Sequence, residues 1–410
     1  MSEAGTSFDP QRLDHIRTWM ARYVDQRKYP GCSFLLLHKG HEVFFHTCGL
    51  RSVEKKLPFE RSTLTRIYSM TKPVTSVALM MLVENGACHL GAPLSEFLPE
   101  FSDMRALIPG AEHLDQTENC ASPTLHQMLT HTGGFSYSFN PGVLPAAMDA
   151  AGLTFEPDQG PLADRVHDLS ALPLAFHPGR RWEYSVSIDV LGRVIEVVAG
   201  KSLDQVFAEQ IFEPLGMRDT AFVVPDGAGD RFASLYSPLS GDAMALNTAA
   251  KGDNPLRLID QAGQSPFEHA TTFSGGGGLI GTIDDYAKFC EMLRRRGAGN
   301  GTRLLGPKIV DFMTRNHLQA DIASMGPESF AEQQMEGMGF GIGGAVILNP
   351  GRVGVPGSVG DYSWGGMAST YFWIDPVNAL TGVFFTQLSP SSSYPSRAEL
   401  KALVHAAMMD

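Results

Sequence analysis

The 410-residue sequence has few cysteines, and their arrangement predicts no cross-linked or metal-bound framework. The five cysteines are scattered, odd in number and include no C-x-x-C pair, so neither a disulfide framework nor a zinc site is indicated. The histidines also lack acidic partners at ligand spacing, as His126 and His131 illustrate, so no metal is predicted. We expect the cysteines to be small core residues in a reducing compartment; they are Cys32, Cys48, Cys88, Cys120 and Cys290.

Basic runs and long hydrophobic segments are absent as well. The chain has 32 Lys and Arg against 44 Asp and Glu, a net charge of -12, which disfavours a nucleic acid partner. The longest apolar run, Val77 to Val83, is too short to cross a bilayer, and Met1 to His15 has no apolar signal region. We therefore expect a cytoplasmic protein with neither a membrane nor nucleic acid as partner. The oligomeric state is not predicted.

The chain does contain the residues of a large core, since 43% are hydrophobic. Its length favours two domains, or one large domain with an insertion. Pro10 follows an N-capping Asp9 and begins a predicted amphipathic helix. Strand-rich runs at 32–38 and 41–48 predict one antiparallel hairpin, and runs at 370–374 and 379–385 predict a second, followed by a helix from about Ser396.

The middle of the chain has a different pattern. Helical periodicity covers 70–84, 125–129, 188–198 and 203–211, with little strand signal between them. We predict a mixed α/β (α+β) fold, with an α/β domain formed by 1–75 and 225–410 and a mainly helical domain formed by 76–224. The segment from Pro225 to Gly278 is rich in turn-forming residues and is expected to be a lid.

Ser69-Met70-Thr71-Lys72 is the most informative short motif. A serine that opens a helix places a lysine three residues later on the same face, and a lysine acts as a base when apolar surroundings disfavour its charged form. The structural alternative for Ser69 is an ordinary helix N-cap. Ser52 to Lys55 also matches S-x-x-K, but it lies in a charged turn, whereas Ser69 precedes a nearly all-apolar helix.

Two further motifs carry candidate site residues. Tyr184-Ser185 precedes the predicted helix 188–198, where a tyrosine could relay protons, although a half-buried structural tyrosine is commoner and Tyr137-Ser138 repeats the dipeptide. Trp364-Gly365-Gly366-Met367 precedes the strand 370–374. Its glycines allow close approach of a substrate, and an edge strand would offer free N–H groups to an oxyanion; the alternative is a glycine-rich turn with a core tryptophan.

Together, Ser69-x-x-Lys72, Tyr184-Ser185 and Trp364-x-Gly366 resemble, in order, the motifs of the serine β-lactamase-like hydrolases: class C β-lactamases, DD-peptidases and family VIII carboxylesterases. The resemblance implies a central antiparallel sheet flanked by the N- and C-terminal helices, a mainly helical domain, and an active site in the cleft between the two. It implies that Ser69 is the nucleophile, that Lys72 and Tyr184 share the acid and base work, and that the N–H groups of Ser69 and Met367 form the oxyanion hole. It implies no cofactor and no metal.

Two departures from the lactamase pattern favour an esterase. Val186 replaces the asparagine of Tyr-x-Asn, and Trp364-Gly365-Gly366 replaces Lys-Thr-Gly, as in family VIII esterases. Loss of that lysine removes a contact of roughly 1.5 to 3 kcal/mol to an acidic substrate. We therefore predict a serine carboxylesterase that forms an acyl-enzyme on short-chain, small-molecule esters, with weak β-lactam hydrolysis at most.

The pocket and the alternatives follow from the same motifs. Trp364 and the segment from Pro225 to Gly278 are expected to wall an apolar acyl pocket, in which Trp364, Gly365 and Gly366 contact the substrate. The alternatives are a β-lactamase or DD-peptidase, an acyltransferase and, least favoured, a non-catalytic scaffold protein. An α/β-hydrolase is disfavoured because no G-x-S-x-G occurs, and Gly275 to Gly278 lacks the Gly-Lys-Ser/Thr of a phosphate loop.

Overall fold

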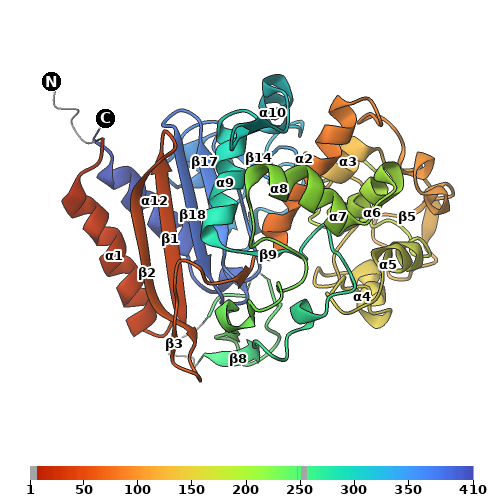
Figure 1. The fold of residues 1–410 in the computed structure, drawn as a ribbon. Helices are drawn as coiled ribbons and strands as arrows, with labels where there is room; N and C mark the ends of the chain where they lie inside the picture. Colours follow the sequence, from red (N-terminus) through yellow and green to blue (C-terminus); the bar gives the residue numbers. More distant parts are fainter. Residues whose placement is uncertain (1–6, 247, 251–255, 410) are drawn as a thin grey trace.

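The computed structural model describes residues 7–246, 248–250 and 256–409. Its main feature is an eight-stranded antiparallel sheet with the strand order β14-β15-β16-β17-β18-β1-β2-β3 (Figure 1). The two predicted hairpins form its centre, because β18 pairs with β1 and so joins the two ends of the chain. The strands are β1 (Gly31–His38), β2 (His41–Ser52), β3 (Leu57–Pro58), β14 (Met338–Phe340), β15 (Ala345–Ile347), β16 (Tyr362–Gly365), β17 (Tyr371–Asp375) and β18 (Leu380–Thr386).

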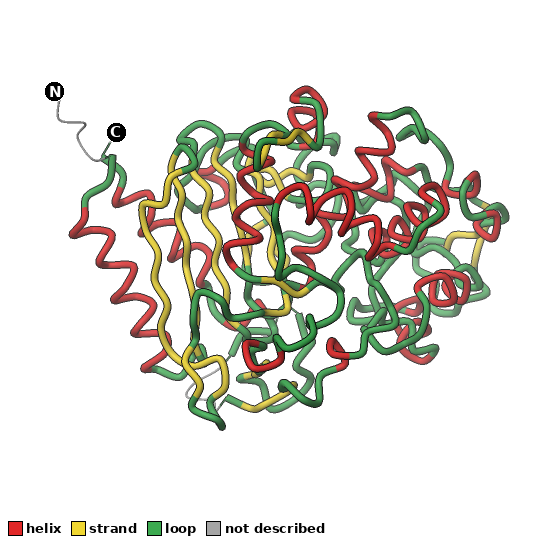
Figure 2. Tube along the Cα trace, in the orientation of Figure 1, coloured by secondary structure: helices red, strands yellow, loops and turns green. Residues whose placement is uncertain are grey.

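The first and last helices cover one face of this sheet, as predicted. In α1 (Pro10–Asp25) the Asp9 side chain accepts hydrogen bonds from two backbone N–H groups of the first turn. Alternate residues of β1, such as Phe34 and Leu36, point toward α1 and α12 (Ser396–Ala407), where they form one hydrophobic cluster. Figure 2 shows both helices beside the strands.

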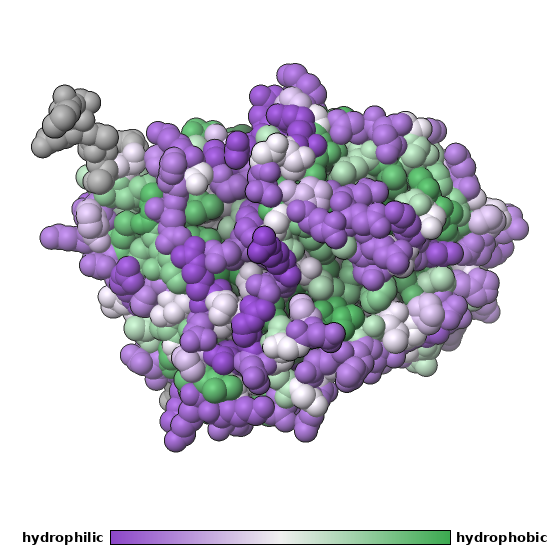
Figure 3. All heavy atoms as spheres, viewed as in Figure 1, coloured by the Kyte–Doolittle hydropathy of each residue, from purple (hydrophilic) through white to green (hydrophobic). Residues whose placement is uncertain are grey.

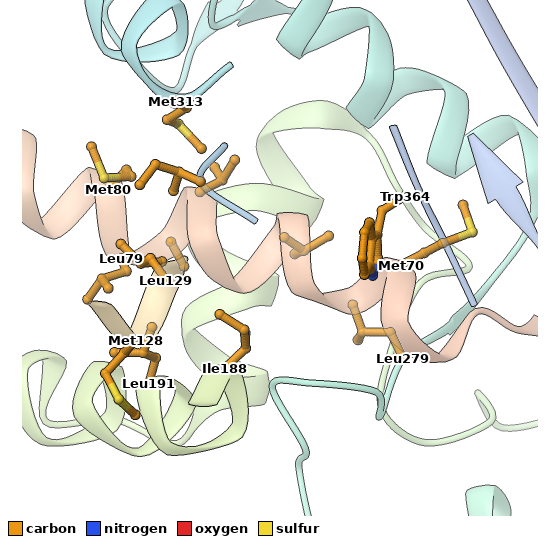
Figure 4. Packing of buried hydrophobic residues seen from close by; sticks show 14 of the residues in the cluster. Met70, Leu79, Met80, Met128, Leu129, Ile188, Leu191, Leu279, Met313 and Trp364 are labelled. Atoms are coloured by element: carbon orange, nitrogen blue, oxygen red, sulfur yellow. The ribbon is translucent and has the colours of Figure 1, made fainter. Parts of the chain in front are cut away.

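The larger core lies on the other side of the sheet, around α2 (Thr71–Glu84) and α9 (Ile283–Arg294). Figure 4 shows Met70, Leu279 and Trp364 together near the start of α2, with Leu79, Met80 and Leu129 further along it. The remaining helices are α3 (Leu125–Leu129), α4 (Val143–Ala150), α5 (Leu162–Leu169), α6 (Ser187–Ala199), α7 (Leu203–Phe207), α8 (Glu213–Leu215), α10 (Pro307–Met313) and α11 (Pro350–Val353). Helices α3 to α8 lie within the predicted helical region, but α2 runs across the boundary expected at residue 75. The division into two domains stays a prediction.

The segment from Pro225 to Gly278, expected to be a lid, packs against the rest of the protein over much of its described length. Its strands β7 (Leu235–Ser237) and β8 (Arg257–Asp260) pair with each other, and Tyr236 is fully buried. The other short pairs are β4 (Thr65–Arg66) with β9 (Ile280–Gly281), β5 (Arg105–Leu107) with β6 (Thr117–Asn119), β10 (Ala298–Gly299) with β11 (Thr302–Arg303), and β12 (Ser329–Phe330) with β13 (Gln333–Gln334).

Polar side chains cover much of the face shown in Figure 3, with hydrophobic ones between them. Among the described residues, no helix combines the length and apolar character needed to cross a membrane. The cysteines are free thiols, and Cys32, Cys88 and Cys290 are buried as expected of core residues. Cys32 and Cys48 are cross-strand neighbours in the first hairpin, with their Sγ atoms 3.6 Å apart, a pairing that sequence analysis did not predict.

Candidate active site

Ser69 lies in a tight turn that leads into α2. The turn is a single 3₁₀ segment, Tyr68–Met70, and Tyr68 has a φ of 42°, in the left-handed region that bulky residues rarely adopt. The N-cap position of α2 is Met70, and no side chain caps this helix. The interpretation of Ser69 as an ordinary N-cap is therefore wrong, and its hydroxyl is available to other groups.

Lys72 is fully buried, and its ammonium is held by three oxygens. Its Nζ donates hydrogen bonds to Ser69 Oγ at 3.2 Å, to the Tyr137 hydroxyl at 2.8 Å and to the carbonyl oxygen of Gly276 at 2.7 Å. An ammonium has three N–H donors, so this set satisfies all of them. The predicted contact between Ser69 and Lys72 is present.

Asp189, in the first turn of α6, places a buried carboxyl group close to Lys72. Its carboxylate accepts hydrogen bonds from the Ser274 hydroxyl and from the N–H of Gly276, the latter at 3.0 Å. Burial raises the pKa of Asp189, while the charge of Lys72 and these two donors oppose the rise. A Cβ atom at Gly276 would collide with this carboxylate, so the contact requires glycine there. Sequence analysis considered this glycine run as a phosphate loop, which it disfavoured.

Two tyrosines surround the lysine, in different ways. The Tyr184 ring lies with its centroid 4.6 Å from Lys72 Nζ, and its hydroxyl accepts a long hydrogen bond of 3.4 Å from Trp364 Nε1. Tyr137, which the sequence offered only as a second Tyr-Ser dipeptide, accepts the short hydrogen bond from Lys72. Burial raises the pKa of the Tyr137 hydroxyl, and the nearby Asp189 and Tyr184 raise it further.

Trp364 and Gly365 end β16, and the chain then turns through Gly366 and Met367 into β17. The strand expected at 370–374 is β17, which lies between β16 and β18, so the expectation of an edge strand there is wrong. β16 pairs with β15 only at Tyr362 and Ser363. The free donor comes from the turn instead: Gly366 N–H donates to the carbonyl of Thr370 at 2.7 Å, whereas among the described residues no acceptor is recorded for the N–H of Met367. A Cβ at Gly366 would strike the Ile67 carbonyl, just before the Ser69 turn, so glycine lets these two segments meet.

All the predicted site residues except the buried Lys72 line one cavity of about 390 Å³. They are Ser69, Tyr184, Trp364, Gly365, Gly366 and Met367. Tyr137 and aromatic residues such as Phe155, Phe267 and Phe330 line it too. The segment expected to wall the pocket contributes Met244 and Leu246, among others.

One cation that sequence analysis did not single out also lines the cavity. The Arg397 guanidinium lies against Gly365, where a Cβ atom would overlap it. Its Nε is 3.0 Å from Oε1 of Glu332, and both side chains are largely buried. This pairing neutralises Arg397, so the cavity contains a basic residue but no free positive charge from it.

One group of potential metal ligands occurs in the described part of the chain: Asp361, Asp375 and His405. The Lys401 ammonium is 2.6 Å from Asp361 and already compensates its charge. The group lies outside the residues that line the cavity.

Comparison with known proteins identifies the family. The family model described as Beta-lactamase matches residues 16–406. The chain belongs to the beta-lactamase family. Among relatives within this family, esterase EstB of Burkholderia gladioli is 29% identical over 96% of this chain and 95% of its own. Lovastatin esterase of Penicillium rubens is 30% identical, covering 84% of this chain and 85% of its own.

A solved structure, described as EstCE1, a hydrolase with promiscuous acyltransferase activity, has a TM-score of 0.78 and 26% identity, covering 96% of this chain and 98% of its own. The resemblance inferred from the sequence, to family VIII esterases within the serine β-lactamase-like enzymes, and the predicted fold class are confirmed. This member of the beta-lactamase family is a serine hydrolase, and its relatives support ester hydrolysis or acyl transfer.

Proposed function

We propose that the protein is a serine carboxylesterase that cleaves short-chain, small-molecule esters through an acyl-enzyme. The observation that carries the proposal is the contact of 3.2 Å between Lys72 Nζ and Ser69 Oγ at the cavity that Trp364 and Met367 also line. Two observations support an ester over an acidic β-lactam: the esterase relatives, and the absence of an unpaired cation near Gly365 among the residues that the structure describes.

The proposed steps use groups of this chain. In the reactive form Lys72 is a neutral amine with a free lone pair. Ser69 Oγ attacks the ester carbonyl while this lone pair takes its proton, and the N–H groups of Ser69 and Met367 bind the oxyanion. Tyr184 gives a proton to the departing alkoxide as the carbon–oxygen bond breaks, which leaves an acyl group on Ser69. Water then attacks this acyl group, and the same groups move protons in the reverse direction to release the acid.

The first experiment compares hydrolysis of p-nitrophenyl acetate and butyrate with that of nitrocefin, for the wild type and Ser69→Ala. We expect fast ester turnover and slow or absent nitrocefin turnover, with both lost in Ser69→Ala. Mass spectrometry of the quenched reaction should show the acyl group on the peptide that contains Ser69. Fast nitrocefin turnover would identify a β-lactamase, and activity that survives in Ser69→Ala would place the nucleophile elsewhere.

A second candidate is acyl transfer to an alcohol or amine, which the described activity of EstCE1 favours. The two reactions share the acyl-enzyme and differ in the acceptor. Adding an alcohol or an amine during p-nitrophenyl butyrate turnover measures the partition between the butyric ester or amide and free butyrate. Product that is mainly the new ester or amide at millimolar acceptor would favour the transferase.

A further inference from the structure

Glu156 places a carboxyl group in the cavity that contains Ser69, at a position that the proposed steps do not use. It lies in the loop between α4 and α5 and lines the cavity together with Phe155 and Pro157. Phe155 and Pro157 are buried, whereas Glu156 keeps part of its surface exposed. A bound substrate would therefore meet this carboxyl group.

Nothing in the described part of the chain neutralises Glu156. No hydrogen bond or ion pair is recorded for its side chain there, in contrast to Asp189, which is held by Ser274 and Gly276. Asp149 and Asp242 add negative charge to the lining, and the single basic residue among the described lining residues, Arg397, is paired with Glu332. The accessible charge of this cavity is negative.

Aromatic rings line the same cavity. Tyr68 and Phe267 meet edge to face, with ring centroids 5.8 Å apart, and both line the cavity with Phe155 and Glu156. Aromatic faces attract cations, and a carboxylate among such rings is the combination that recognises ammonium groups. A neutral aliphatic substrate would gain nothing from the carboxylate.

We propose that Glu156 is a specificity-determining residue and that the preferred substrates are esters that carry an ammonium group. The inference rests on the proposed esterase function and adds the chemical class of the substrate. The ammonium group would lie among Tyr68, Phe155 and Phe267 with Glu156 as its counter-charge, while the ester carbonyl reaches Ser69.

The charge state of Glu156 gives the preference a pH dependence. The titratable groups that face it are Asp158 on its own loop, Asp260 of β8, which is paired with Arg66, and the Tyr68 hydroxyl. Burial first, then Asp158 and Asp260, raise the pKa of Glu156 to about 7. The carboxyl is neutral below that pH and charged above it, so the preference for a cation should grow as the pH rises from 6 to 8.

The test uses matched pairs of esters that differ in charge and not in shape. One pair is p-nitrophenyl 4-(trimethylammonio)butyrate and p-nitrophenyl 5,5-dimethylhexanoate, and a second pair, butyrylthiocholine and its 3,3-dimethylbutyl analogue, carries the cation on the leaving group. We expect kcat/KM for the cationic ester of one pair to exceed that of its neutral partner by about tenfold at pH 8, mainly through KM. Using the ratio at each pH cancels the titration of the catalytic groups.

Two variants distinguish a direct contact between Glu156 and the ammonium group from a general effect of negative charge near the cavity. Glu156→Gln should bring the ratio close to one at both pH values. Asp158→Asn, which removes the same charge from an exposed position on the same loop, should keep most of the preference. A ratio near one for both wild-type pairs, or a preference that survives Glu156→Gln, would overturn the inference.

Hydrolysis of the neutral esters tests the proposed esterase function separately from the ammonium site. Binding of both members of a pair to Ser69→Ala, measured by calorimetry, gives the same ratio without turnover. If neither ester is hydrolysed but the cationic one binds more tightly, the esterase proposal fails and the ammonium site stands. If the neutral ester is hydrolysed and binding shows no preference, the esterase stands and the ammonium site fails.

Discussion

Two buried cations, Arg66 and Lys72, lie on either side of Ser69 in the sequence, and neither has exposed surface. Arg66 is fully paired: its guanidinium contacts the Asp260 carboxylate at 2.5 Å, donates to the Ala233 carbonyl at 2.7 Å and lies 4.1 Å from the centre of the Phe232 ring. Lys72 makes no ion pair within 4 Å in the described part of the chain, and two of its three partners are hydroxyl groups.

The difference shows that the kind of partner, and not burial, distinguishes a structural cation from a catalytic one. The Asp260 carboxylate pairs with the Arg66 guanidinium and ties β8 to the segment before Ser69. Hydroxyl groups can exchange protons with Lys72, as the proposed acid and base work requires. The comparison predicts that changes around Lys72 affect activity, whereas changes around Arg66 affect stability.

The largest expected effect is on activity at Lys72. Lys72→Met should lower kcat for p-nitrophenyl butyrate by about 10³-fold or more, because the proton of Ser69 then has no recorded acceptor in the described part of the chain. The thermal unfolding midpoint should change little, since an apolar side chain of similar length replaces the ammonium in a buried site. Steady-state kinetics and calorimetric melting measure the two effects. A much lower unfolding midpoint with an unchanged kcat below that midpoint would make Lys72 a structural cation like Arg66.

The next effect is on stability, at the partner of Arg66. Asp260→Asn leaves a buried guanidinium without its counter-charge and should lower the free energy of unfolding by about 3 to 5 kcal/mol. Urea unfolding followed by circular dichroism measures the change. Glu209→Gln, which breaks the exposed pair between Lys201 and Glu209, is the matched control and should cost about 0 to 1 kcal/mol. If both variants lowered the free energy of unfolding equally, the buried pair of Arg66 would stabilise the fold no more than an exposed pair does.

A finer distinction separates the two tyrosines beside Lys72. Tyr184→Phe should lower kcat by about 100-fold if this hydroxyl protonates the leaving group, whereas Tyr137→Phe should lower it about 10-fold, because Lys72 keeps two other acceptors. Tyr362→Phe is the control: its buried hydroxyl donates to the Ile342 carbonyl at 2.8 Å, so its loss should affect stability and leave kcat unchanged. If Tyr137→Phe has the larger effect, the proton-transfer role belongs to Tyr137.

The sequence predicted the parts of this site that depend on local spacing. The hairpins, the terminal helices and the positions of Ser69 and Lys72 follow from patterns within one element. Tyr137 and Gly276 could not be found in that way, because they reach Lys72 from loops 65 and 204 residues away along the chain. Loops carry no periodic signal, and a contact between distant segments depends on how the elements pack. The expectation that the strand 370–374 lies at an edge failed for the same reason, since strand order is not a local property.

The smallest expected effect is at the cavity wall, where we expect Trp364 to act through its shape, in contrast to the charged Lys72 and Arg66. Its ring is stacked on Phe330, with centroids 6.2 Å apart, and its Nε1 contacts the Tyr184 hydroxyl. Trp364→Ala should raise the ratio of kcat/KM for p-nitrophenyl octanoate to that for the acetate by about 3- to 10-fold, because removal of the ring enlarges the acyl pocket. Trp364→Phe keeps an aromatic wall without the N–H group and should keep the acyl-chain profile. The assays should be run at a temperature below the unfolding midpoint of each variant, because loss of a buried tryptophan lowers the free energy of unfolding by about 3 to 5 kcal/mol. An unchanged profile in Trp364→Ala would remove Trp364 from the acyl wall and leave it as a packing partner of Tyr184.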